Sequence, residues 1–158
     1  MFNGLPLHPL AVHFPIALAC LSPCIISIFI WGSSRHKWPH RSWIWILAFH
    51  GLLLGSSIAS KQLGEQDEER VEQVIQESAL ELHEEWGERF TVAAGIVFLA
   101  SLLPLFLRRK QAGALLLLVS SLALLVIGIQ TGHSGAELTY RHGAAQAYSQ
   151  PGLIYDHD

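Results

Sequence analysis

Charged residues are scarce in this sequence of 158 residues. Asp, Glu, Lys and Arg make up 15% of it, against about 25% in a typical soluble domain, while hydrophobic residues make up 51%. No stretch alternates polar and apolar residues in the way that the strands of a membrane barrel do. A soluble domain and a β-barrel are therefore both disfavoured, and a helical membrane protein is expected.

Sulfur is scarce as well, with two cysteines and one methionine. Cys20 and Cys24 fall inside one apolar run, which does not resemble a disulfide framework. A copper site built on soft sulfur is disfavoured because Met1 is the only methionine. The chain has no CxxCH motif for covalent haem attachment, and it has no Walker loop, zinc-protease motif or nucleophile–base pair. An electron-transfer subunit is therefore favoured over a stand-alone enzyme, although enzymatic activity stays undecided.

Four apolar stretches are long enough to cross about 30 Å of hydrocarbon, which takes about 20 helical residues. We expect these spans at residues 10–31, 42–60, 89–107 and 112–131. The fold class that follows is all-α: a four-helix transmembrane bundle forming one integral membrane domain over residues 1–158. A signal peptide is the rival interpretation of the first stretch, but no Lys or Arg precedes it and the run is too long. Pro9 suits a first helical turn, and Pro15 predicts a kink because it has no backbone N–H.

The basic residues predict the orientation of the spans. Six of the ten Lys and Arg residues lie in two loops without acids, which therefore mark the cytoplasmic side of a bacterial inner membrane: Arg35, Lys37, Arg41, Arg108, Arg109 and Lys110. Both termini are then periplasmic. Four tryptophans form the aromatic belt expected at the inner face: Trp31, Trp38, Trp43 and Trp45. Topology thus explains the basic residues, and nucleic-acid binding is not expected.

Ten of the thirteen acids lie between Glu65 and Glu88, in the loop before the third span. The same loop has an apolar stripe at helical spacing, which predicts an amphipathic outer helix over residues 66–88. One interpretation is a solvated helix that packs its stripe on the rim of the bundle. The other is a docking surface for a basic periplasmic partner, such as a soluble cytochrome. The two interpretations are compatible.

Five of the nine histidines are predicted to lie at or just outside the periplasmic rim: His8, His13, His83, His133 and His142. Histidine is the commonest metal ligand and a usual axial ligand of haem iron. We therefore expect one or two b-type haems, with His13 and His133 as the first axial pair. His8, His83 and His142 would supply a second pair or hydrogen bonds to haem propionates. Arg89 and Arg141 are candidates to neutralise haem propionates, and Glu137 is a further candidate cofactor residue.

Two alternatives to haem remain open. One is a single transition metal, zinc, iron or copper, held by histidines together with Glu84, Glu85 or Glu137. The other is the absence of any cofactor, the rim histidines simply bonding to loop carbonyls.

His50 differs from the others because it lies about 12 Å inside the second span, counted at 1.5 Å per residue. Residues expected at the same depth are Ser22 or Cys24, Ser101, and Ser120 or Ser121. A hydrogen-bonded packing role is one interpretation of His50, and a proton path is the other. A proton path is less favoured because the spans contain no carboxylate.

Two motifs at the ends of the chain resemble those of a known family. Residues 8–18, HPLAVHFPIAL, resemble a pattern HPxxVHFPIAL, and residues 131–146, TGHSGAELTYRHGAAQ, resemble TGxxGGxLVYxHGxGV. The closing motif departs from its pattern at four positions: Ala136, Thr139, Ala145 and Gln146. A third segment, ELHEEWGE around His83, is also similar. The family is a bacterial one of small predicted membrane proteins of unknown function.

The resemblance implies four spans in a bacterial inner membrane. Relatives stand beside, or are fused to, cytochrome c and Rieske-type domains, which implies redox work. We therefore expect a subunit that passes electrons between the quinol pool or a redox membrane complex and a periplasmic c-type cytochrome, with quinone among the candidate ligands. The alternative is a non-redox structural or assembly subunit whose small-residue faces, such as GLLLG at residues 51–55, pack against a larger complex.

Overall fold

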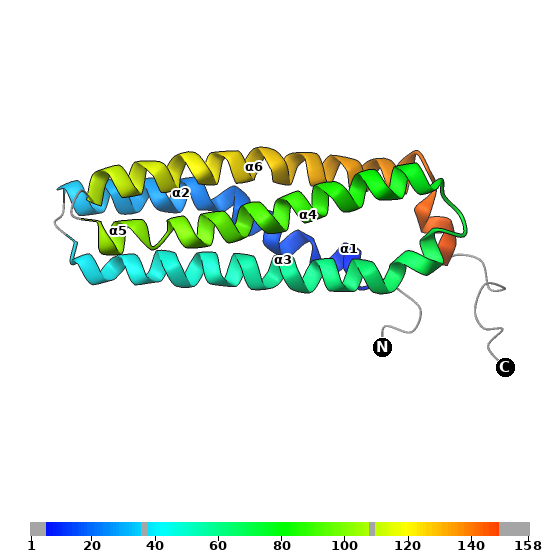
Figure 1. Ribbon diagram of the computed structural model, residues 1–158, viewed down its shortest axis with the longest axis horizontal. Helices are drawn as coiled ribbons and strands as arrows, with labels where there is room; N and C mark the ends of the chain where they lie inside the picture. Colours follow the sequence, from blue (N-terminus) through cyan, green and yellow to red (C-terminus); the bar gives the residue numbers. More distant parts are fainter. Residues whose placement is uncertain (1–5, 36–37, 108–109, 149–158) are drawn as a thin grey trace.

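A computed structural model of the chain describes residues 6–35, 38–107 and 110–148. Four residues named above lie outside this part of the chain: Met1, Lys37, Arg108 and Arg109. The described residues are helical, without strands (Figure 1). In order, the elements are α1 (His8–Ala11), α2 (His13–Arg35), η1 (His40–Ser42), α3 (Trp43–Val71), α4 (Glu77–Ala100), α5 (Leu103–Phe106), α6 (Lys110–Tyr140) and η2 (Ala144–Tyr148). Four helical segments are long and apolar enough to span a membrane, which confirms the predicted all-α class.

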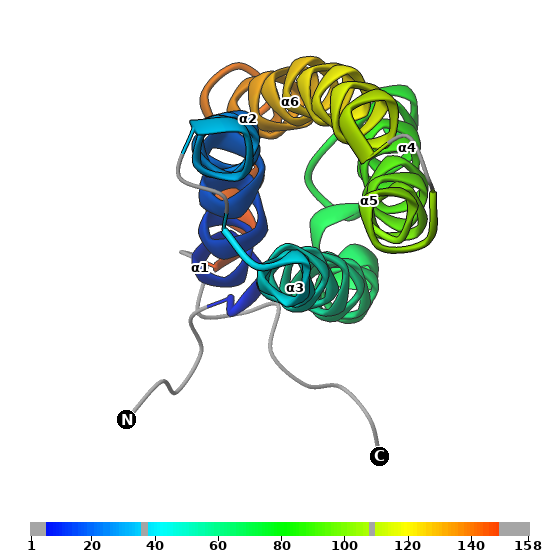
Figure 2. The same cartoon turned by 90° about the vertical axis from the view of Figure 1, so that its left-hand side faces the viewer.

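The four long helices surround one apolar core. Seen end-on, they follow one another around the bundle in the order α2, α6, α4 and α3 (Figure 2). The core takes residues from each of them, including Leu18, Ile26, Ile46, Leu53, Val97, Leu117 and Leu124. Only 28–33% of each apolar stretch is buried inside the bundle. The remaining apolar surface suits contact with lipid, which solvates apolar side chains as well as a protein core does.

The first helix breaks near its start. α1 ends at Ala11, and α2 begins at His13 on the far side of Val12. Pro15 has no N–H to offer the carbonyl of Ala11, and its ring crowds that carbonyl, so the break falls one turn before the proline. The change of direction carries α1 away from α2 and onto α3, where His8 meets the backbone of Ser60.

The predicted outer helix over residues 66–88 is divided between two longer helices. Its first part continues α3 as far as Val71, and its second part starts α4 at Glu77. Residues 72–76 turn between them, with the N–H groups of Val74 and Ile75 bonded to the Val71 carbonyl. The chain must reverse there because α3 and α4 are antiparallel neighbours, as Figure 1 shows.

The last long helix runs further than the sequence indicates. The fourth span is predicted to end at residue 131, but α6 continues to Tyr140. The chain turns instead at Gly143, whose φ of 75° is favourable for glycine. One face of its last turns packs against α4, where Ser134 and Gly135 contact His83. The bundle therefore extends beyond its apolar spans into an end with α1, the α3–α4 turn and η2, which we call the acidic end.

Candidate functional site

His8 is fixed at the acidic end by a bond from α1 to α3. Its Nδ1 lies 2.8 Å from the Ser60 carbonyl oxygen. A carbonyl only accepts, so Nδ1 carries the proton and donates it. In the neutral ring Nε2 is then unprotonated and is the nitrogen that can ligate a metal. A ligating histidine is usually held in this way, with its other nitrogen donating to a carbonyl.

His83 is fixed in the same way by a bond from α4 to α6. Its Nδ1 lies 2.9 Å from Oγ of Ser134, and that hydroxyl donates to the Thr131 carbonyl at 3.0 Å. Since the single hydroxyl proton is used in the second bond, Nδ1 of His83 must donate in the first. Nε2 is again the unprotonated nitrogen of the neutral ring.

The rings of His8 and His83 lie together although they are 75 positions apart in the chain. Their centroids are 6.1 Å apart and the ring planes are inclined at 77°. His83 lies before Arg89, outside the apolar part of α4, and burial followed by the nearby His8 lowers its pKa to about 4. The His83 ring is therefore neutral near pH 7, the state that binds a metal. We call His8 and His83 the imidazole pair.

Each ring of the pair lies against a glycine of the neighbouring helix. A Cβ added at Gly64 of α3 would lie 3.1 Å from Cε1 of His8, and one at Gly135 of α6 would lie 3.0 Å from Cε1 of His83. Both distances are shorter than ordinary van der Waals contact, so a larger residue would displace the ring. The two glycines thus provide the space that the imidazoles occupy.

The donors near the pair suit a group that brings its own ligands. No three His, Cys, Asp or Glu side chains in the described residues are arranged to hold a metal ion. Ser60, 5% exposed, has a buried hydroxyl that bonds to no described residue, beside the carbonyl that holds His8. Protein zinc sites take three or four protein ligands, whereas haem iron needs one or two because the porphyrin supplies the rest. Two imidazoles and a free hydroxyl are thus the donor groups that the described residues provide here.

The other three candidate histidines have exposed side chains. Nδ1 of His13 bonds to the Pro9 carbonyl at 2.6 Å, and Nε2 of His133 lies 3.8 Å from Glu137. No hydrogen bond or ring contact joins His13 to His133 or either to His142 in the described segments. Of the five predicted ligands, the structure thus joins His8 and His83.

Arg89 and Arg141, the candidate partners of haem propionates, are each paired with a glutamate. Arg141 donates to Glu137 at 2.7 Å, four residues earlier on its own chain. Arg89 pairs with Glu85 in the same way and also lies over the Trp86 ring, 4.8 Å from its centroid. Both pairs are exposed, so each contributes about 0–1 kcal/mol to stability and can be exchanged for another partner.

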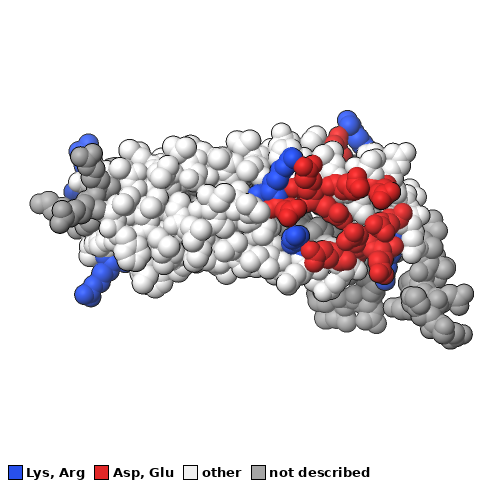
Figure 3. Space-filling view, viewed as in Figure 1, with Lys and Arg blue, Asp and Glu red and all other residues white. Residues whose placement is uncertain are grey.

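Carboxylates gather on one face of the acidic end, over the neighbouring ends of α3 and α4 (Figure 3). The pKa of Glu84 is raised by partial burial and by the negative charges of four other acids, Glu68, Glu72, Glu81 and Glu65. Glu65 and Glu68 lie on α3 and Glu72 directly follows it, so acids of α3 and α4 face each other. This arrangement gives the surface a strong negative potential.

His50 is fully buried between α2 and α3, and both ring nitrogens are bonded. Nε2 accepts from the Ser22 hydroxyl at 2.8 Å, and Nδ1 donates to the Ile46 carbonyl at 2.9 Å. Ser101 and Ser121 are also fully buried, as the predicted polar layer requires, but their hydroxyls bond to carbonyls of their own helices. His50 therefore has the packing role rather than a free nitrogen for ligation.

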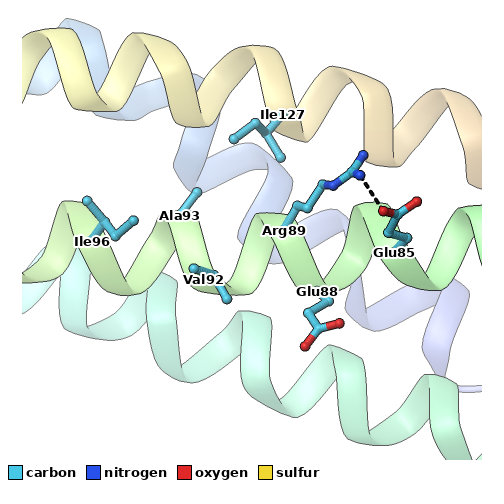
Figure 4. A pocket seen from close by; sticks show the side chains of 7 residues that line it. All are labelled: Glu85, Glu88, Arg89, Val92, Ala93, Ile96 and Ile127. Atoms are coloured by element: carbon cyan, nitrogen blue, oxygen red, sulfur yellow. Dashed lines mark hydrogen bonds and ion pairs between the residues drawn. The ribbon is translucent and has the colours of Figure 1, made fainter.

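A shallow groove of about 440 Å³ lies along the outward-facing junction of α4 and α6. Its inner part is apolar and its outer part is polar (Figure 4). The lining residues are Glu85, Glu88, Arg89, Val92, Ala93, Ile96 and Ile127.

These features define a four-helix membrane protein with an imidazole pair beneath a negatively charged surface. Residues 4–147 match the family described as predicted membrane protein (DUF2231), so the chain belongs to that family, whose function is unknown. No curated protein and no solved structure matches the chain. Family membership was inferred from the end motifs, and the match confirms it. The association of relatives with cytochrome c and Rieske-type domains stays a prediction.

Sequence reasoning missed Ser60, Ser134 and the two glycines that receive the rings. Ser134 follows His133 directly, yet the two side chains differ by about 100° around α6. A signal for Ser134 was present: it shares a helix face with Thr131 and Leu138, at spacings of three and four residues. No comparable signal marks Ser60, because its contribution is a backbone carbonyl.

Proposed function

We propose that this protein is a membrane electron-transfer subunit that binds a b-type haem through His8 and His83. The observation that carries the proposal is the imidazole pair, with each Nδ1 held by an acceptor and the ring centres 6.1 Å apart. Two neighbouring histidines with Nε2 unprotonated would supply the protein ligands that haem iron needs. Haem iron held by histidine exchanges single electrons between its ferric and ferrous states.

The residues of the chain would tune that group. The Ser60 carbonyl and the Ser134 hydroxyl would fix the ring orientations, and the free hydroxyl of Ser60 is available to a polar edge of the ligand. Arg89 and Arg141 would neutralise propionates by exchanging their present carboxylate partners. A second haem held by His13, His133 or His142 stays a prediction, as does a role for Glu137.

The acidic face supports the choice of partner. It would attract a basic, soluble c-type cytochrome of the periplasm. The positive-inside rule predicts that the acidic face lies on the periplasmic side of a bacterial inner membrane. A redox membrane complex would be the other partner, alongside the lipid-exposed helices.

Optical spectroscopy of the purified protein tests this proposal. We expect a b-type α-band in the reduced-minus-oxidised spectrum and a positive pyridine haemochrome assay. His8→Ala and His83→Ala should each abolish or shift the band, while Tyr140→Phe, at an exposed position of α6, should retain it. A wild-type spectrum without the band overturns the proposal. So does a band that persists unchanged in both His8 and His83 variants.

One observation favours a second candidate, a non-redox structural or assembly subunit. Three histidine–serine bonds each join two helices, from His8 to Ser60, from Ser22 to His50 and from His83 to Ser134. Such bonds stabilise helix packing in membranes without any cofactor. On this view, the His8 and His83 variants lose thermal stability, and the wild type contains no haem and copurifies with a larger complex.

A further inference from the structure

The groove between α4 and α6 combines two kinds of lining. Val92 and Ile96, each 57% exposed, form its apolar part together with Ile127 of α6. Glu85, Glu88 and Arg89 form its outer end, where the apolar part of α4 begins (Figure 4). From Arg89 to Ile96 the groove follows about 10 Å of helix at 1.5 Å per residue. An occupant therefore has a polar head at the membrane boundary and an apolar chain that extends toward the bilayer centre.

The charges at the polar end disfavour an anionic head. Arg89 is paired with Glu85, and Glu88 adds a second negative charge beside them. A phosphate head group would meet two carboxylates for one guanidinium. An uncharged head with both donors and acceptors is better matched, since carbonyl oxygens accept from Arg89 and hydroxyls donate to Glu85 or Glu88.

The dimensions favour a single-chain molecule. A volume of about 440 Å³ lies in the lower part of the range of small-ligand sites. One groove between two helices accommodates one chain, whereas a phospholipid has two.

We propose that the α4–α6 groove binds an isoprenoid quinone or quinol, with its ring at Glu85, Glu88 and Arg89 and its chain along Val92, Ile96 and Ile127. The choice of a redox-active head group rests on the proposed electron-transfer function. The site would bring that head close to the imidazole pair, because Arg89 lies about 9 Å along α4 from His83.

Photolabelling of the full-length protein in detergent tests the site. The probe is a photoreactive azido-quinone, the competitor is decylubiquinone, and labelled peptides are identified by mass spectrometry. Ile96→Trp fills the groove, and Leu99→Trp is the matched control because Leu99 is an equally lipid-exposed residue of α4 (62%) that does not line it. Both side chains point toward lipid, so neither change should affect folding.

We expect saturable labelling within residues 85–96 and near Ile127, competed by decylubiquinone. Ile96→Trp should weaken the apparent affinity about tenfold or more, while Leu99→Trp leaves it unchanged. The proposal is overturned if phosphatidylethanolamine competes with labelling as well as decylubiquinone does. It is also overturned if Ile96→Trp and Leu99→Trp bind the probe with the same apparent affinity. The haemochrome assay on the same samples separates the two proposals. Quinone binding without haem overturns the redox function alone, and haem without quinone binding overturns the groove site alone.

Discussion

The histidines of this protein differ in what their two nitrogens meet. His50 has both nitrogens bonded inside the bundle, so it stabilises packing and has no lone pair to offer. His8 and His83 use Nδ1 alone to reach another helix, which leaves Nε2 for a ligand. Residue type alone does not separate these roles, but the tautomer imposed by each partner does.

The neutral state of His83 predicts a pH-dependent stability. Its pKa is lowered from 6.5 to about 4 by burial and by His8, so the unfolded chain binds more protons than the folded one between these values. The free energy of unfolding should therefore carry no penalty from His83 above about pH 6.5, and it should fall as the pH drops toward 4. Thermal unfolding in detergent at several pH values measures this loss.

His83→Gln isolates the contribution of this ring, because the acids titrate alike in both proteins. The difference between wild type and variant should depend on pH, whereas His133→Gln, at an exposed position, should reproduce the wild-type profile. A His83→Gln profile parallel to that of the wild type would contradict the prediction.

At the scale of elements, close contacts place the histidines. α6 packs against α4 beyond the apolar span because Gly128 and Gly135 leave room for Phe90 and His83. The break at Val12 serves a similar purpose, since it directs α1 to α3 instead of continuing α2. Helix length and helix interruption together bring four helices, α1, α3, α4 and α6, to the imidazole pair.

Gly135→Ala should destabilise the contact between α4 and α6. The new Cβ would lie 3.0 Å from Cε1 of His83, so the ring must shift and its bond to Ser134 must weaken. Overpacking of this kind costs about 1–3 kcal/mol. Denaturant unfolding in mixed micelles measures the change.

Gly87→Ala is the matched control, because a Cβ there has nothing within 4 Å. It should be neutral or stabilise α4 by about 0.5–1 kcal/mol through helix propensity. Equal effects of the two substitutions would show that the contact with His83 is unimportant.

The sequence predicts the features that depend on residues close together in the chain, and it does not predict those that depend on contacts between distant segments. The spans follow from apolar length, and the helical class follows from the backbone's need for internal bonds. The meeting of His8 with His83 depends on which helices become neighbours, which single-sequence patterns do not encode. The continuation of α6 past residue 131 is not predicted, because glycines such as Gly132 and Gly135 permit both a helix end and close packing, and only the partner helix decides between the two.

At the scale of the whole molecule, charge is distributed along the bundle axis. Ten acids lie between Glu65 and Glu88, near one end, and Arg35 and Arg41 lie at the other (Figure 3). The acidic face covers the end that contains the imidazole pair. A cationic partner attracted to this face would be brought close to the proposed redox site.

Binding of a lysine-rich c-type cytochrome should therefore depend strongly on salt. We expect the Kd to rise about tenfold or more between about 0.05 M and about 0.5 M NaCl, because screening shortens the reach of surface charges. Surface plasmon resonance with the protein in nanodiscs measures it. Glu68→Gln with Glu84→Gln should weaken binding at low salt, whereas Arg41→Gln, at the opposite end, should not. A Kd insensitive to both salt and these acids would contradict the prediction.

The contact between α1 and α3 has a consequence for biogenesis. His8 is synthesised 52 residues before its acceptor at Ser60. The partner of His83 on α6 comes 51 residues after it. Both histidines are therefore synthesised before their hydrogen-bond partners. Neither ring can reach its native position until later spans have been inserted. Any prosthetic group that needs the two rings would have to be loaded after translation of the fourth span, so cofactor delivery would act as a checkpoint on completed chains.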